Sequence, residues 1–109
     1  MLEIETTEEY DLWMSRLRDL RAKQHITRYF ERQQLGSVIT GDIKQVAPKV
    51  IEVRFHIGPG YRVYLTQEER RLVLLLVGGD KSTQRRDIEK AKELAKLWRE
   101  ERSQENKEV

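Results

Sequence analysis

The spacing of apolar residues in the first third of the chain predicts a short strand followed by two helices. Residues 2–5 alternate between apolar and polar, as a half-buried strand does. Thr6 and Glu9 have the spacing of a capping box, and helical spacing follows at Tyr10, Trp13, Met14, Leu17 and Leu20. A second helical series, out of phase with the first, consists of Ala22, Ile26, Tyr29 and Phe30. We therefore expect a break at residues 19–21 and an antiparallel helix pair that ends at Gly36.

The remaining pattern predicts strands and then one last helix. Residues 43–46 fit a short edge strand before Pro48. Residues 50–57 alternate, the sequence Gly-Pro-Gly at 58–60 signals a turn, and residues 61–66 alternate again, which predicts a β-hairpin. The apolar run 72–77 is typical of a strand buried on both faces, and the glycines at 78 and 79 are expected to end it. Ser82 or Thr83 is then expected to cap a helix with apolar positions Ile88, Ala91, Leu94, Ala95 and Trp98.

This order of elements predicts an α+β fold. Strands that come after a run of helices favour an N-terminal strand and helix pair packed on one face of a mostly antiparallel sheet, with a C-terminal helix. The other face of the sheet is expected to be open. The chain has 109 residues, the size of one domain, which we place at residues 1–98. Residues 99–109 are polar and charged, and we expect them to form a frayed tail.

Charge is distributed unevenly along the chain. The formal net charge is +2, but residues 1–13 carry five carboxylates and no Lys or Arg, and residues 93–109 carry five acidic and four basic groups. The 17 basic and 9 acidic residues between positions 14 and 92 leave a net charge of +8 there. Such a basic segment attracts polyanions, which makes nucleic acid a candidate partner, although the same charges also fit an ordinary solvated surface.

The composition disfavours several classes of protein. No apolar run approaches the ~18 to 20 residues of a membrane span, and the N-terminus lacks the layout of a signal peptide, so we expect a cytoplasmic protein with no membrane partner. The absence of cysteine removes disulfides, Cys-based zinc sites and a thiol nucleophile. His25 and His56 have no spacing to each other or to carboxylates that indicates a metal site, so we expect neither a metal nor another cofactor.

Four side chains of the predicted hairpin are expected to share one small patch of the sheet. If the hairpin closes over the three-residue loop 58–60, His56 lies opposite Arg62, and Arg54 lies opposite Tyr64. Glu52 is the one acid on that face, so the two guanidinium groups favour an anion between them. A phosphodiester fits this description because guanidinium groups bind phosphate through two parallel hydrogen bonds. The same residues also fit an ordinary solvated strand surface, and the pattern alone does not separate the two interpretations.

Lys81 is a second candidate for binding phosphate. It lies in the glycine-rich run 78–83, and such turns can bind anions where they lead into a helix. The run lacks the spacing of a Walker motif. The end of a strand followed by a helix cap explains the same residues, and local pattern favours that structural explanation.

Two runs of residues occur in order along the chain, RFHIGPGYRVY at 54–64 and GGDKSTQ at 78–84, followed by Asp87, Ile88 and Ala91. Together they resemble the signature of the phage-type, HigB-like addiction-module killer proteins of the RelE/ParE toxin superfamily. The resemblance covers residues 2–98. It implies a bacterial toxin of a type II toxin–antitoxin module, neutralised by a cognate antitoxin that is a helix-turn-helix protein. RelE-like members enter the ribosomal A site and cut mRNA.

The resemblance also implies which residues form the site. Arg62 and Arg54 correspond to the phosphate-binding groups, with Tyr64 and Lys81 beside them, and His56, Tyr64 and Lys81 are candidates for general acid and base. The implied activity is a metal-independent endoribonuclease that uses the RNA 2′-OH and inhibits translation, with mRNA and the ribosome as partners. A gyrase inhibitor of the ParE kind and a non-catalytic relative that binds only its antitoxin are the alternatives, because fold does not decide function. Convergent arginines on a sheet face favour RNA.

Overall fold

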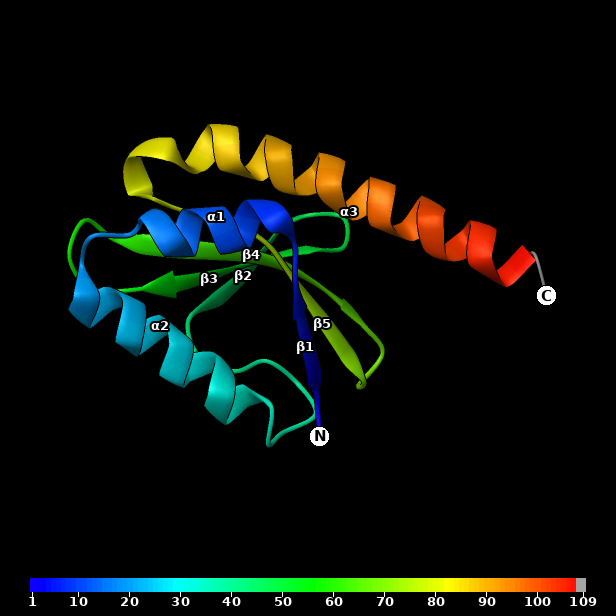
Figure 1. Ribbon diagram of the computed structural model, residues 1–109, viewed down its shortest axis with the longest axis horizontal. Helices are drawn as coiled ribbons and strands as arrows, with labels where there is room; N and C mark the ends of the chain where they lie inside the picture. Colours follow the sequence, from blue (N-terminus) through cyan, green and yellow to red (C-terminus); the bar gives the residue numbers. More distant parts are fainter. Residues whose placement is uncertain (108–109) are drawn as a thin grey trace.

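Figure 1 shows the computed structural model, which describes residues 1–107. Three helices surround a five-stranded, mostly antiparallel sheet, which confirms the predicted α+β class. In chain order the elements are β1 (Glu3–Thr6), α1 (Glu8–Arg16), α2 (Leu20–Gln33), β2 (Ile43–Ala47), β3 (Val50–Phe55), β4 (Tyr61–Glu68), β5 (Leu72–Asp80), the 3-10 turn η1 (Lys81–Thr83) and α3 (Gln84–Lys107). The strands lie in the order β1-β5-β4-β3-β2, in which β1 pairs with β5 in parallel and the other neighbours are antiparallel.

The break between the first two helices follows from their capping residues. Thr7, rather than the predicted Thr6, caps α1, and its hydroxyl oxygen accepts a hydrogen bond from the backbone amide of Tyr10 at 3.0 Å. Asp19 caps α2 in the same way, so the second helix begins at Leu20, which the apolar pattern had assigned to the first helix. The predicted break is therefore confirmed. Its position is set by the cap rather than by the apolar residues.

Both faces of the sheet are covered, so the prediction of an open face is wrong. On one face α1 and α2 pack against the core, and on the opposite face α3 packs against a second buried cluster. Strand residues of the first core include Val53, Val63, Val73 and Leu75. Strand residues of the second include Val50, Tyr64, Leu74 and Leu76. Because β5 is apolar on both sides, an uncovered second face would leave its side chains in water, and α3 removes that cost through Ala91 and Ala95.

Gly78 and Gly79 lie inside β5 and do not end it, since the strand continues to Asp80. A Cβ atom on Gly78 would lie 2.2 Å from Cε3 of Trp13 on α1, and a Cβ atom on Gly79 would lie 1.9 Å from Oδ2 of Asp87 on α3. These distances are too short for real contacts. The two glycines therefore allow α1 and α3 to approach the strand closely from its two sides.

We expect Gly78→Ala to lower the free energy of unfolding by about 1 to 3 kcal/mol, because the new methyl group overlaps the Trp13 ring and overpacked sites must shift. Chemical denaturation of the purified protein measures the change. Gly36→Ala is the matched control, since a Cβ atom there would meet its nearest neighbour, the carbonyl oxygen of Gln33, at 3.6 Å. Equal stability losses in the two variants would contradict the close-approach explanation.

The polar segment after Trp98 is helical up to Lys107, which differs from the predicted frayed tail. Nε of Arg102 lies 2.8 Å from Oε2 of Glu68, and the Arg102 guanidinium lies 4.9 Å from the centre of the Trp98 ring. These contacts tie the last turns of α3 to the end of β4. Residues 108–109 of the predicted tail lie outside the described part of the chain. Among the helices of residues 1–107, none combines the length and apolar character that crossing a membrane requires.

Candidate functional site

The hairpin of β3 and β4 pairs in a register different from the predicted one. Arg54 lies opposite Arg62, not opposite Tyr64, and Phe55 pairs with Tyr61. The predicted register is therefore wrong by two residues. A shift of two residues preserves the face to which a side chain points, so Arg54 and Arg62 still share one face of the sheet, now as direct neighbours.

The longer loop between the two strands accounts for the shift. Residues 56–60 all lie outside the strands. Gly58 and Gly60 have φ angles of 54° and 81°, a region that favours glycine, and the amide of Gly60 donates a hydrogen bond to the carbonyl of Ile57 at 3.1 Å. The chain thus makes its tight turn within the loop rather than directly between paired strand residues. His56, expected to be paired in the strand, belongs to this loop.

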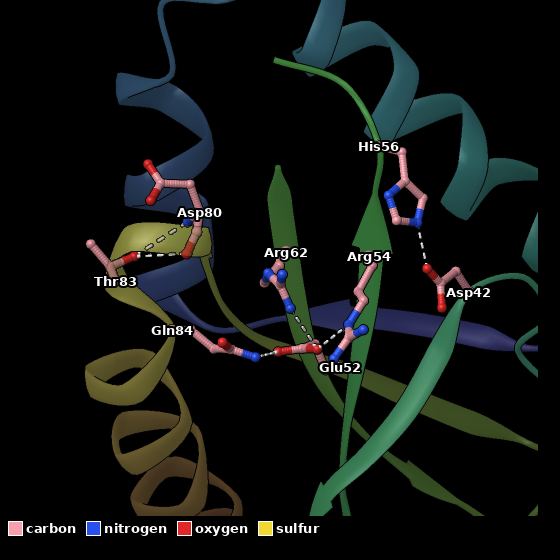
Figure 2. A network of polar contacts seen from close by, with 8 residues as sticks. All are labelled: Asp42, Glu52, Arg54, His56, Arg62, Asp80, Thr83 and Gln84. Carbon is pink, nitrogen blue, oxygen red and sulfur yellow. Dashed lines mark hydrogen bonds and ion pairs between the residues drawn. The ribbon is translucent and has the colours of Figure 1, made fainter. Parts of the chain in front are cut away.

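Glu52 is the centre of the polar cluster that we define as the Glu52 network, Glu52, Arg54, Arg62 and Gln84 (Figure 2). Its Oε1 atom accepts hydrogen bonds from Nε of Arg54 at 2.7 Å and from Nη1 of Arg62 at 2.9 Å. Its Oε2 atom accepts one from Nε2 of Gln84, the first residue of α3, at 2.8 Å. The sheet and α3 therefore meet at one carboxylate.

The carboxylate of Glu52 is fully buried, and its hydrogen-bond and ion-pair partners stabilise its negative charge. Burial alone would raise the pKa of Glu52, but the hydrogen bonds from Arg54 and Gln84 and the charge of Arg62 outweigh it and hold the pKa below its ordinary value. Glu52 is therefore ionised at neutral pH. The anion expected between the two arginines is thus supplied by the protein itself.

The two arginines differ in how much of each remains available. The Arg62 side chain is 12% exposed, which corrects the expectation that it points into solvent. Its Nε atom is buried and has no hydrogen-bond partner among residues 1–107. The Arg54 side chain is 31% exposed and contacts Glu52 through Nε. Within residues 1–107, no hydrogen bond occupies the two terminal amino groups of Arg54. Two guanidinium charges against one carboxylate leave a net charge of +1, carried to the surface mainly by Arg54.

Tyr64 is fully buried rather than exposed on an open face. Burial, and secondly the charge of Glu52, raise the pKa of its phenol well above the ordinary value, and no hydrogen bond of normal geometry joins the hydroxyl to a partner in the described residues. Tyr64 packs among the residues under α3. A buried phenol with a raised pKa is a poor general base for a substrate bound at the surface.

His56 lies outside the Glu52 network. Its side chain is 77% exposed, and its Nε2 atom makes a short contact with Oδ2 of Asp42. In Figure 2 this pair lies on one side of Arg54, and Gln84 lies on the other side. Asp42 belongs to the segment between α2 and β2, and its backbone carbonyl accepts a hydrogen bond from the amide of Arg54. The same loop thus fixes the strand and one nitrogen of the His56 ring.

Lys81 is exposed at the start of η1 and adjoins the hairpin loop. A Cβ atom added to Gly60 would lie 3.7 Å from the Cβ atom of Lys81. The glycine-rich run around it is not an open anion nest. Asp80 caps η1, the turn that leads into α3, and its carboxylate accepts a hydrogen bond from the Ser82 amide at 2.8 Å. These contacts support the helix-cap part of the structural explanation, whereas Gly78 and Gly79 lie inside β5 and do not end the strand. Lys81 is therefore a separate exposed cation beside the hairpin loop.

Three residues of this site could not be identified from the sequence as functional. Glu52 alternates with apolar residues as a solvated strand residue does, and Gln84 and Asp42 lie in polar segments with no distinguishing spacing. The one usable signal was that Glu52 is the single acid between two arginines on its face. Groups of three or more metal-ligating side chains are not found within residues 1–107.

Comparisons with known proteins identify a relative in Haemophilus influenzae. No protein-family model matches the chain, and no solved structure matches it. The chain is 49% identical over 94 residues to a protein of Haemophilus influenzae described as "Uncharacterized protein", and the alignment covers 86% of this chain and 93% of that protein. The chain therefore belongs to the same family as this Haemophilus influenzae protein.

Proposed function

We propose that this member of the family of the Haemophilus influenzae protein is the toxin of a type II toxin–antitoxin module. Its activity is the cleavage of mRNA on the ribosome without a metal, and its antitoxin is a helix-turn-helix protein that covers the Glu52 network. The proposal rests on the resemblance in residues 54–64 and 78–84 and on the α+β order of elements that the resemblance implies.

The observation that carries the proposal is the way in which Arg54 is held. Glu52 fixes its Nε atom at 2.7 Å and leaves both terminal amino groups unoccupied within residues 1–107, on a side chain that is 31% exposed. A guanidinium group held by a buried carboxylate is preorganised, so it need not be ordered when a phosphate arrives. A merely solvated surface arginine has no reason to be held in this way.

The chemistry of RNA cleavage assigns separate roles to the exposed groups. The 2′-OH of a ribose attacks the adjacent phosphate, and negative charge develops on the phosphorane oxygens as the 5′-oxygen leaves. Arg54 stabilises that charge, and Lys81 adds a second cation from η1. Arg62 acts through Glu52 as a positioning residue. His56 is the candidate for proton transfer, because Asp42 orients one ring nitrogen and leaves the other free to exchange a proton.

One observation favours the gyrase-inhibitor alternative. Glu52 neutralises one of the two arginines, so the cluster also makes sense as a structural network that supports a protein-binding surface. Such a surface needs no group for proton transfer. The two functions predict different first effects in the cell: mRNA cleavage stops protein synthesis first, and gyrase inhibition stops DNA synthesis first.

Induction of this chain in bacteria without its antitoxin is expected to arrest protein synthesis before DNA synthesis. Pulse labelling with an amino acid and with thymidine at successive times after induction measures both processes. A matched strain that expresses the Arg54→Ala variant at the same level is the control and should keep its amino-acid incorporation. If thymidine incorporation falls first while amino-acid incorporation holds, the gyrase alternative replaces the proposal.

A further inference from the structure

Helix α2 carries a row of basic side chains on its solvent side. Its buried face consists of Ala22, Ile26, Tyr29 and Phe30, which pack into the core shared with α1. A different face of the helix presents Arg21, His25, Arg28 and Arg32, at the intervals i, i+4, i+7 and i+11 that place residues in one row. All four are exposed. We call Arg21, Arg28 and Arg32 the arginine row; α2 is cyan in Figure 1.

The charge of the arginine row is not compensated within the described structure. Ion pairs hold both arginines of the Glu52 network and several cations of α3, for example Lys92 with Glu89, but within residues 1–107 none involves a residue of α2. The acidic residues nearest to the row in sequence are Asp19 and Glu31, and both make other contacts. Asp19 caps α2 and accepts a hydrogen bond from the Tyr61 hydroxyl, and Glu31 lines an apolar groove beside β1.

We infer that the arginine row is a second nucleic-acid surface, separate from the Glu52 network, that binds the phosphate backbone of duplex RNA. At a rise of 1.5 Å per residue, Arg21 and Arg32 are separated by about 16 Å along the helix axis, so the row can follow several phosphates. Arginine suits this ligand because its planar fork matches the oxygens of a phosphate. The choice of RNA over DNA rests on the proposed function.

The surroundings of the row favour a duplex backbone over single strands. Proteins that bind single strands offer aromatic rings on which bases stack, but Tyr29 and Phe30 of α2 are buried, and the His25 ring packs nearly perpendicular to the ring of Phe55. The row therefore offers charge without a stacking platform. Recognition of this kind depends on backbone and shape and depends strongly on salt.

A binding experiment with an uncleavable probe tests the inference. The probe is an RNA duplex made of 2′-O-methyl nucleotides, which lacks the attacking hydroxyl, and its affinity is measured by fluorescence anisotropy over a range of salt concentrations. The triple variant Arg21→Ala, Arg28→Ala, Arg32→Ala is compared with a control of equal charge change, Lys44→Ala, Arg70→Ala, Lys96→Ala, whose three side chains are exposed elsewhere.

Loss of three phosphate contacts should reduce the steepness of the plot of log K against log salt by about 2.7, so that a fourfold rise in salt weakens wild-type binding roughly 40-fold more than it weakens the row variant. The control should keep at least two thirds of the wild-type slope. Equal losses in both variants, or no binding of the duplex by the wild type, would overturn the inference. Equal or tighter binding of a DNA duplex through the same row would overturn its assignment to RNA.

The result is distinguishable from a failure of the proposed function, because the probe is read by binding and not by cleavage. A protein that cleaves mRNA but does not bind the duplex overturns the arginine row alone. A protein that binds the duplex through the row but leaves translation intact overturns the proposed toxin activity alone.

Discussion

Glu52→Gln is expected to lower the free energy of unfolding by about 3 to 5 kcal/mol, because it removes one partner of a buried ion cluster. The substitution preserves the shape of the side chain but removes the carboxylate that lies between Arg54 and Arg62. The two arginines then repel each other as direct neighbours on paired strands. Arg62 is most affected, because its side chain is 12% exposed and cannot turn to water. Urea denaturation at neutral pH measures the loss.

The pH dependence of that loss provides an independent check. The pKa of Glu52 lies below its ordinary value in the folded protein, so its ion pairs stabilise the fold fully above the unfolded-state pKa of about 4.3 and lose that effect as pH falls through the lower folded-state pKa. The difference in stability between wild type and Glu52→Gln should therefore be constant near neutrality and shrink below about pH 4. Glu105→Gln, on the exposed surface of α3, is the control and should change stability by less than about 0.5 kcal/mol. A small, pH-independent loss for Glu52→Gln would mean that the network is not a buried ion cluster.

The secondary structure was predictable because it depends on local patterns. The helix pair, the edge strand β2, the hairpin and the central strand β5 were each encoded in the spacing of apolar residues and in the caps and turns between them. The sequence also contains the signal that the second face of the sheet is covered, but the signal is divided between β5 and the helix that follows it. β5 is apolar on both sides, and the helix after it is amphipathic, so an open face was inconsistent with the pattern of β5 itself.

The strand register could not be predicted because it depends on the backbone of a loop. The sequence Gly-Pro-Gly suggested that residues 58–60 alone connect the strands, whereas the turn uses positive φ angles at Gly58 and Gly60 within a longer loop. A shift of two residues is invisible to alternation, since it leaves every side chain on its own face. That shift determines whether Arg62 lies opposite His56 or opposite Arg54, and therefore which side chains of the site are direct neighbours.

The burial of the site could not be predicted either, because it depends on α3. Glu52 and Tyr64 alternate with apolar residues as exposed side chains do, and both are fully exposed to water if the face is open. The helix places Gln84 against Glu52 and closes over Tyr64, which are contacts between distant parts of the chain. The alternating pattern thus predicts surface positions for both residues, whereas Glu52 lies in a buried polar network and Tyr64 lies in the apolar cluster under α3.

Cleavage of mRNA is expected to separate the roles of the two arginines. Arg54→Ala should lower the cleavage rate about 10²- to 10³-fold, the usual cost of losing one donor that stabilises transition-state charge, while Glu52 keeps Arg62 and Gln84 as partners. Arg54→Lys retains the charge beside Glu52 but not the planar fork, so we expect stability close to wild type and cleavage still reduced at least about tenfold. Arg62→Ala should lose both stability and activity, because it leaves the buried Glu52 with less compensation.

The measurement that distinguishes these outcomes is primer extension on mRNA from translating ribosomes, with thermal melting of each variant and an assay temperature at which all variants are folded. Arg70→Ala, in the exposed turn between β4 and β5, is the matched control and should cleave like the wild type. Arg54→Lys is the most informative variant, because it changes the geometry of the donor and little else. If it cuts at the wild-type rate, the cation is needed only as a charge and the held fork of Arg54 is not a phosphate-binding group. If Arg54→Ala also cuts normally, the Glu52 network is structural and the reacting phosphate binds elsewhere on the protein.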